Sequence, residues 1–363
     1  MILDTYLARK FLWSLALVFS VFMVLLLLID LIDELQDFPD LPFGDVLYTV
    51  LLNVPASNYE ILPLVVVLAT VALFIRLARS SELVVVRATG RSALRSLAAP
   101  LAVVGLLGVL TVTMINPIVA AASKRHNDLV NSHYGGGAAI LVIASEGLWL
   151  RQGGPEGQTV IHAERASSDL TVLFDTTFMD FAPDGRPARR ITARTARLDG
   201  DGWTLYRTKT WDLSQGGNPE ASAVETAQMR LNTALTQDRI LDSFGKPEFI
   251  PIWDLPAFID QLEQAGFSAR RYAMWYQMEL AAPLFLIALV MISAAFTMRH
   301  ARLANTGLSV LTAVLLGFGL HYIRNFAQIL GENGEIPVIL AAWAPPVAGL
   351  LLATGILLHM EDG

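Results

Sequence analysis

The stretch LAAPLAVVGLLGVLTVTMI, residues 97–115, contains no charged residue. A helix needs about 20 predominantly apolar residues to cross a hydrocarbon core of about 30 Å, and this stretch approaches that length. The chain of 363 residues has 54% hydrophobic and 16% charged residues, with a mean hydropathy of +0.50. Soluble domains carry about 25% charged residues. The sequence therefore predicts an integral membrane protein.

Further apolar runs accompany this stretch. They cover about residues 11–29, 46–75, 272–296, 303–323 and 337–358. The first is too long for a removable signal peptide and lacks the small-residue cleavage pattern. Pro55 and Pro63 should bend the second run, because proline has no backbone N–H to donate. We predict six transmembrane helices in two groups of three, separated by one long insertion.

The basic residues of the short loops predict the orientation of the spans. They precede the first span, separate the second from the third, and separate the fourth from the fifth: Arg9 and Lys10; Arg76, Arg79, Arg87, Arg91 and Arg95; Arg299 and Arg302. Lys and Arg are retained on the cytoplasmic side of a membrane. These three loops should therefore face inward, and the long insertion should face outward.

The insertion has the pattern of a β-domain. Alternating or β-branched runs cover residues 138–150, 159–166, 170–181, 189–198, 203–213 and 222–231, and Gly, Asp, Asn and Pro fill the gaps between them. Consecutive hairpins of this kind indicate a sandwich or jelly roll. We predict transmembrane helices in residues 1–133, a β-jellyroll-like domain in 134–252, and a connecting helix (253–265) with the remaining spans in 253–363.

The segment SELVVVRATG, Ser81 to Gly90, lies between the second and third spans. It places one acid, Glu82, next to the apolar residues Leu83, Val84 and Val85, while its flanks are cationic. An apolar face with one polar residue suits a helix that docks in a partner's groove. Gly90 should end that helix. The alternative is a helix lying on lipid headgroups, with its arginines held by anionic lipid.

Several activities are excluded or disfavoured by the composition. A net charge of −7 and a pI near 5.4 argue against nucleic-acid binding. The absence of cysteine excludes disulfides and thiolate chemistry. The Gly245-Lys246 pair is followed by Pro247, so the chain has no phosphate-binding loop of the Gly-Lys-Ser/Thr kind. The histidines lack metal-ligand spacing. We expect no catalytic residue, cofactor or metal in this chain.

Seven short motifs resemble, in order, those of the lipopolysaccharide-export permeases of the LptF/LptG family. They are the pattern at Ser81 to Gly90, Asp4-x-Tyr6, Tyr134-Gly135-Gly136, Glu146-Gly147-Leu148-Trp149, Gly202-Trp203-x-Leu205, Arg271-Tyr272 and Gly317-Phe318-Gly319. The resemblance covers essentially the whole chain. It is nearer to the LptG branch than to the LptF branch.

The resemblance implies a permease subunit of an ABC-type exporter in a Gram-negative inner membrane, with the β-jellyroll in the periplasm. Its implied partners are an LptF-like permease, an LptB-like ATPase dimer, an LptC-like single-span protein and an LptA-like periplasmic bridge. Lipopolysaccharide would enter between span one of one permease and span five of the other. The ATPase would act through Glu82, Leu83, Val84, Val85, Arg87 and Gly90.

Lipid A phosphates require cations at the outer mouth of such a vestibule. The basic residues near the outer ends of the spans are Lys124, Arg125, Arg270, Arg271 and Arg324, and Arg324 is the best single candidate. Apolar residues at near-helical spacing on spans one and five would line the path of the acyl chains: Phe19, Phe22, Leu26, Phe318 and Tyr322. Interfacial anchoring and helix packing are the alternative roles for these residues.

Two features depart from this interpretation. The family has basic residues at the outer end of span one, whereas this chain has Asp30, Asp33 and Glu34. That difference fits a less phosphorylated lipid or a divalent-cation bridge. Glu60 and Glu279 are acids inside apolar spans, which leaves open a lipid transporter driven by an ion gradient.

Overall fold

The computed structural model describes residues 2–88, 90–133, 140–144, 147–154, 157–167, 171–199, 202–214, 218–233, 246–264, 268–298 and 306–362. The chain divides into two compact units. The first, called the membrane unit below, comprises Met1–His126, Pro251–Trp253 and Arg270–Gly363. The second, called the β-unit, comprises Asn127–Ile250 and Asp254–Ala269.

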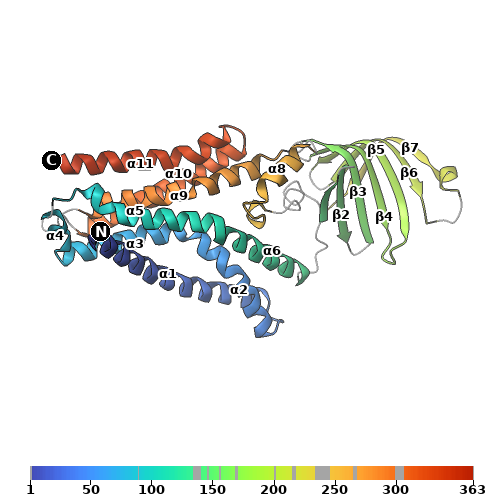
Figure 1. Cartoon of the computed structure of the whole chain (residues 1–363). Helices are drawn as coiled ribbons and strands as arrows, with labels where there is room; N and C mark the ends of the chain where they lie inside the picture. The colour runs from blue at the N-terminus through green and yellow to red at the C-terminus, as the bar shows by residue number, and fades with distance from the viewer. Residues whose placement is uncertain are drawn as a thin grey trace. The chain divides into compact units, whose positions relative to one another are not determined.

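Helices make up the membrane unit. They are α1 (Ile2–Asp37), α2 (Phe43–Glu60), α3 (Leu62–Arg79), α4 (Glu82–Ala88), α5 (Ala93–Leu110), η1 (Thr111–Ile115), the first part of α6 (Asn116–His133), α9 (Arg270–Thr297), α10 (Thr306–Glu332) and α11 (Val338–Asp362) (Figure 1). Among the described residues, six helical stretches are long and apolar enough to cross a membrane. This finding confirms six predicted spans with an inserted β-domain between the third and the fourth, although the second candidate span is Leu62–Arg79 rather than residues 46–75.

The second and third spans are not regular helices. The second is divided at Ile61 into α2 and α3, and Pro63 occupies the first turn of α3, where its missing N–H is tolerated. The third widens into a π-helix, η1, before α6 begins at Asn116. π-Helical turns within α-helices are often found at functional sites.

Helix α9 is the centre of the membrane unit and packs against α3, α5, α10 and α11. Small residues allow the closest approaches. A Cβ atom added to Gly108 would lie 2.7 Å from the Pro283 backbone, and one added to Gly317 would lie 2.8 Å from the Val67 side chain. Since lipid is as apolar as leucine, close backbone packing of this kind replaces the hydrophobic effect in holding membrane helices together.

The β-unit is built on one antiparallel sheet in the strand order β1 to β7. Its strands are β1 (Ile140–Ala144), β2 (Gly147–Gly154), β3 (Gly157–Ala166), β4 (Val172–Phe181), β5 (Pro187–Asp199), β6 (Gly202–Asp212) and β7 (Val224–Asn232). Each strand pairs with its neighbour in sequence, as consecutive hairpins require. The run predicted at residues 138–150 is two strands, because β1 and β2 pair with each other.

Non-glycine residues with positive φ bend the middle of this sheet. Asp175 in β4 has a φ of 51° and Arg207 in β6 a φ of 53°. At both positions two residues, instead of one, separate consecutive buried residues: Leu173 is followed by Thr176 in β4, and Leu205 by Thr208 in β6. Figure 1 shows the resulting curvature of the sheet. One face can therefore stay buried on both sides of the bend.

Aromatic and aliphatic side chains fill the buried face of the sheet. Trp203 and Phe178 are both 1% exposed, and their ring centroids lie 6.2 Å apart in an edge-to-face arrangement. The predicted connecting helix is present as α8 (Leu255–Gln264), with Leu255 and Leu262 buried on one side. Tyr134-Gly135-Gly136, Glu146, Arg299 and Arg302 lie outside the described residues.

Candidate functional site

The short helix α4 lies between the second and third spans, where the sequence predicts a docking helix. Ser81, with a φ of 61°, turns the chain into it, and its carbonyl accepts the backbone N–H of Val84. Gly90, with a φ of 77°, follows the end of the helix. A positive φ is accessible to glycine without a Cβ penalty, so Gly90 suits this exit.

The Glu82 carboxylate is bound by the first helix of its own chain. Lys10 Nζ donates to both carboxylate oxygens at 2.7 Å, and the Tyr6 hydroxyl donates to Oε2 at 2.7 Å. Lys10 also lies over the Tyr6 ring, 4.7 Å from its centroid. Glu82 therefore fixes α4 to α1, and in this structure its oxygens are engaged within the chain.

A second ion pair supports the same attachment. Arg91, just after α4, donates to both carboxylate oxygens of Asp4, at 2.5 and 3.1 Å. A bidentate pair of this kind fixes orientation as well as distance. With Glu82, it joins both ends of the α4 segment to the first turns of α1.

The apolar residues of α4 divide between two faces. Leu83 and Val86 are 6% and 4% exposed, and Leu83 belongs to the core of the membrane unit. Val84 and Val85 are 52% and 64% exposed. Of the three apolar residues predicted to dock, only Val84 and Val85 are thus available to a partner. The Arg87 side chain lies outside the described residues.

The electrostatics of Glu82 follow from these contacts. The Lys10 ammonium donates to the carboxylate and lowers the pKa of Glu82 below its ordinary value of 4.5, with a further contribution from the Tyr6 hydroxyl. The pair is therefore ionised at neutral pH. Sequence reasoning placed Lys10 in a basic flank and Tyr6 in a motif, but it could not predict that both contact a residue more than 70 positions away.

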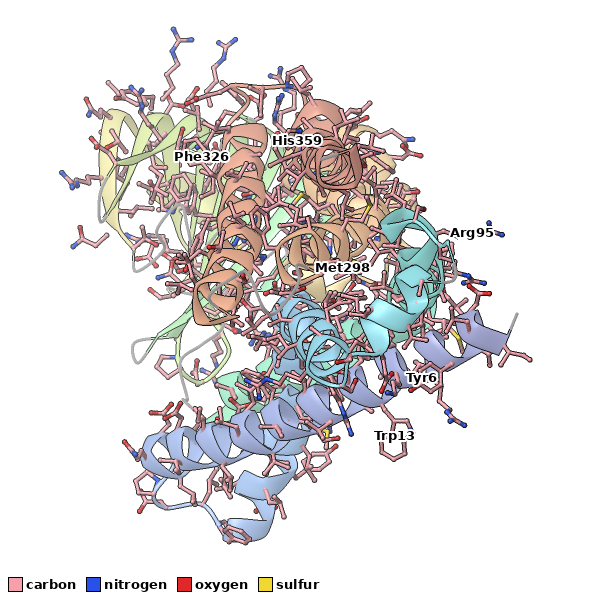
Figure 2. The ribbon with its side chains drawn as sticks, turned by 90° about the vertical axis from the view of Figure 1, so that its left-hand side faces the viewer. Tyr6, Trp13, Arg95, Met298, Phe326 and His359 are labelled. Atoms are coloured by element: carbon pink, nitrogen blue, oxygen red, sulfur yellow. The ribbon has the colours of Figure 1, made fainter. Side chains whose placement is uncertain are left out.

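Cationic residues around α4 are turned outward. Arg76 and Arg79 at the end of α3 and Arg95 in the first turn of α5 have exposed side chains. Figure 2 shows Arg95 extending away from the ribbon. Exposed cationic side chains therefore flank the α4 segment in the sequence, which suits an acidic partner groove.

The basic residues proposed for lipid phosphates are in different environments. Lys124 and Arg125 on α6 are exposed, and Arg271 is half-buried. Arg270 donates to the carbonyl oxygens of Gly331 and Ile336, at 2.6 and 2.9 Å, and so braces the turn between α10 and α11. Arg324 donates to the Met278 carbonyl at 3.3 Å and stacks on the Phe285 ring at 4.7 Å. Its guanidinium points into the membrane unit.

The two predicted apolar stripes lie on separate helices. Phe19, Phe22 and Leu26 on α1 are half-buried, and Phe318 and Tyr322 on α10 are exposed. Helix α1 packs on α2, α3 and α5, whereas α10 packs on α3, α9 and α11. Figure 2 shows Trp13 projecting outward from α1 and labels Phe326, which is 63% exposed, on α10. The structure thus leaves both helices with broad exposed apolar faces.

Asp30 and Glu34, near the C-terminal end of α1, lie against polar side chains of α2 and α6. Asp30 Oδ2 accepts from Ser57 Oγ at 2.9 Å and from Asn53 Nδ2 at 3.2 Å. Glu34 Oε1 lies 3.9 Å from His126 Nε2 on α6. Among the described residues, no group of three or more acidic, His or Cys side chains could hold a metal ion. The structure gives no support for the predicted divalent-cation bridge from this chain alone.

Within the described residues, six membrane-length helices, a sheet inserted between the third and the fourth, and a short surface helix held between the second and the third define a multi-span membrane protein of the permease type. Residues 5–359 match the family described as lipopolysaccharide export system permease LptF/LptG, and the chain belongs to this family. The family identification confirms the resemblance predicted from the sequence motifs.

Individual relatives point in the same direction. The chain is 26% identical over 314 residues to the lipopolysaccharide export system permease protein LptG of Escherichia coli strain K12. The match covers 85% of this chain and 81% of that protein. The LptG protein of E. coli O6:H1 strain CFT073 matches with the same identity and coverage.

Proposed function

We propose that this chain is the LptG-type permease subunit of an ATP-driven lipopolysaccharide exporter in a Gram-negative inner membrane. The observation that carries this proposal is α4, which exposes Val84 and Val85 while Glu82 and Arg91 hold it to α1. A surface helix that is fixed to the bundle and exposes apolar side chains is suited to receive force from another subunit. The family membership supplies the cargo.

The energy would come from a separate ATPase. The sequence lacks a phosphate-binding loop, so a permease of this kind needs a partner that binds and hydrolyses ATP. We propose an LptB-like dimer whose acidic groove takes Val84 and Val85, with Arg76, Arg79 and Arg95 at its rim. In this arrangement Glu82 positions the helix and does not itself contact the ATPase.

The attachment of α4 to α1 suggests how the force is used. Helix α1 has 36 residues and is therefore about 54 Å long. Displacement of α4 would be passed through the Lys10–Glu82 and Asp4–Arg91 pairs to the first turns of α1. We propose that α1 moves in response and that its apolar residues, with those of α10 in a partner permease, narrow the space that holds the acyl chains.

The remaining partners follow from the same family. We propose an LptF-like permease as the second half of the vestibule, an LptC-like single-span protein, and an LptA-like bridge that continues from the β-unit. Residues 134–252 would then lie in the periplasm. Lys124 and Arg125, which are the exposed members of the basic set, are better placed for lipid phosphates than Arg324, whose guanidinium is turned inward.

Co-purification tests the coupling proposal. Val85→Asp places a charge on the exposed face of α4, and we expect it to reduce recovery of the ATPase with the permease by at least about tenfold, because desolvating an unpaired carboxylate in an apolar groove is unfavourable. Val224→Asp is the matched control, since Val224 is 60% exposed on strand β7. Equal ATPase recovery from both variants would contradict the proposal.

A charge exchange tests the role given to Glu82. Glu82→Lys should uncouple ATP hydrolysis from lipopolysaccharide release, because it places two ammonium groups together. The double variant Lys10→Glu/Glu82→Lys restores an ion pair with reversed polarity and should recover most of the coupling. If Glu82 contacted the ATPase directly, the double variant would stay uncoupled. Transport driven by an ion gradient without the ATPase would contradict the proposed function as a whole.

A further inference from the structure

The irregular third span contains a backbone carbonyl that lacks its regular α-helical donor. Pro117 follows Asn116 at the start of α6 and has no backbone N–H. In a regular helix this N–H would bond to the carbonyl of Thr113, four residues earlier. Thr113 lies within the π-helix η1. There the Asn116 N–H bonds to the Thr111 carbonyl, five residues earlier.

A segment from much later in the chain supplies the missing donor. The Trp253 indole N–H donates to the Thr113 carbonyl at 3.2 Å, and the backbone N–H of Ile252 donates to Asn116 Oδ1 at 3.0 Å. Ile252 is 2% exposed. We call Pro251–Trp253 the return segment, because these three residues belong to the membrane unit while the residues on both sides belong to the β-unit.

The other side of Asn116 meets a buried carboxylate. Glu279 on α9 is 3% exposed and accepts a hydrogen bond from the Tyr59 hydroxyl on α2. The Asn116 side chain interacts with both Glu279 and Tyr59. Its Oδ1 atom already accepts from Ile252, so the side-chain N–H₂ is the group that can donate to the carboxylate.

Arg324 brings a fourth helix to the same place. It interacts electrostatically with Glu279, and its guanidinium is held by the Met278 carbonyl and the Phe285 ring. Helices α2, α6, α9 and α10 therefore meet at one buried carboxylate. Buried polar groups of this kind have few alternative partners, so they tend to rearrange together.

We propose that Asn116 is a positioning residue that links the return segment to Glu279, so that a rearrangement of α2, α9 or α10 during transport is passed to Pro251–Trp253. This inference rests on the proposed transport function. It assigns Asn116, Tyr59, Glu279 and Trp253 a common role in the transport cycle, in addition to the coupling through α4.

Substitutions at Asn116 can distinguish its role as acceptor for the Ile252 N–H from its role as donor to Glu279. Asn116→Asp keeps an oxygen acceptor for Ile252 but removes the amide donor from Glu279. Adding Glu279→Gln supplies an amide on the opposite side, so the double variant reverses the polarity of the pair. Asn58→Asp is the matched control: Asn58 is also a buried asparagine, but its amide donates to the Val54 carbonyl of its own helix. It introduces a buried carboxylate without touching Asn116.

Hydrogen exchange in the intact complex measures the link directly. The probe is the Ile252 amide, compared between the nucleotide-free complex and the complex held with a non-hydrolysable ATP analogue. In the wild type we expect its exchange rate to differ about tenfold between the two states. Asn116→Asp should abolish this difference, the double variant should restore it, and Asn58→Asp should leave it unchanged.

Lipid release gives a second readout. Asn116→Asp should lower lipopolysaccharide release per ATP hydrolysed about tenfold, while ATPase recovery stays at the wild-type level. Retained ATPase separates Asn116→Asp from Val85→Asp, which should lose the ATPase, and the Ile252 exchange readout separates it from Glu82→Lys, which does not touch the return segment. Trp253→Phe, at a residue that is 64% exposed, provides a variant that should fold and should speed exchange at Ile252.

The inference is overturned if Ile252 exchange is the same in both nucleotide states of the wild type. It is also overturned if Asn116→Asp retains the difference, or if the double variant fails to restore it.

Discussion

Two glutamates of this protein have similar partners in different surroundings. Glu82 and Glu279 each accept a hydrogen bond from a tyrosine hydroxyl, from Tyr6 and Tyr59 respectively. Glu82 is half-buried and has a direct ion pair with Lys10. Glu279 is 3% exposed, accepts from the Tyr59 hydroxyl, and interacts with the Asn116 side chain and, electrostatically, with Arg324.

The difference shows how the environment sets the role of a charge. A partly exposed ion pair is screened by water and contributes little stability, so its partners can be exchanged at small cost. A buried carboxylate held by dipoles cannot lose one partner without leaving the other groups unsatisfied. Glu82 is therefore suited to a replaceable mechanical link, and Glu279 to a fixed junction between helices.

The largest expected effect is at the buried site. Glu279→Ala leaves the Tyr59 hydroxyl and the Asn116 amide without their acceptor, and it leaves the Arg324 charge uncompensated. We expect it to lower the free energy of unfolding by about 3–5 kcal/mol, measured by denaturant titration in detergent. Glu60→Ala is the control, because Glu60 is exposed on α2 next to Tyr59 and should change the value by less than about 0.5 kcal/mol.

The two tyrosines provide a matched comparison. Tyr59→Phe removes one donor from a buried carboxylate and should cost about 1–3 kcal/mol. Tyr6→Phe removes the equivalent donor from Glu82, where Lys10 and water remain, and should cost about 0.5–1 kcal/mol. The same unfolding titration measures both. Equal costs would show that burial does not distinguish the two sites.

The exposed ion pair should contribute least to stability. Lys10→Met keeps most of the apolar stem and removes the charge, and it should cost about 0.2–1 kcal/mol in the same titration. Its effect on ATP-coupled release should be much larger than its effect on stability. A stability loss comparable to that of Glu279→Ala would contradict the division of roles proposed for the two glutamates.

The smallest expected effect is the pH dependence of the stability that the Lys10–Glu82 ion pair contributes. The pKa of Glu82 is below its ordinary value of 4.5, chiefly because Lys10 donates to the carboxylate. A depressed carboxyl pKa gives stability that is complete above the unfolded-state pKa and is lost as the pH falls through the lower folded-state value. The stability difference between wild type and Lys10→Met should therefore be constant from pH 7 to about 5 and decline only below pH 4.5. Thermal unfolding over this pH range measures it.

Local patterns were sufficient to predict much of the fold. Apolar runs are long enough to mark the spans, and Pro63 marks the division of the second. Turn residues separate most of the strands, although the run at residues 138–150 conceals a hairpin. Only Ser145 and Glu146 separate the two strands, and they are not one of the Asn-Gly or Asp-Gly pairs that mark a hairpin, so the sequence pattern does not reveal two strands.

Contacts distant in sequence limited the prediction of the site. Nothing local to Glu82 indicates that Tyr6 and Lys10 bind it, and nothing local to Arg324 indicates that its guanidinium turns inward. The predicted docking face included Leu83, but Leu83 packs into the core of the membrane unit. The sequence of a seven-residue helix does not show which of its faces packs against the rest of the chain. Asn116 was missed, although a polar residue followed by Pro117 in an apolar run was a usable signal.

The return segment also has a consequence for biosynthesis. Tyr59 and Asn116 are translated and inserted well before their partners, since Glu279 follows Tyr59 by 220 residues and Ile252 follows Asn116 by 136 residues. The first three spans are therefore synthesised before Glu279 and Ile252 are available to Tyr59 and Asn116. The polar junction of the membrane unit can therefore be completed only after the last strand of the β-unit has been synthesised.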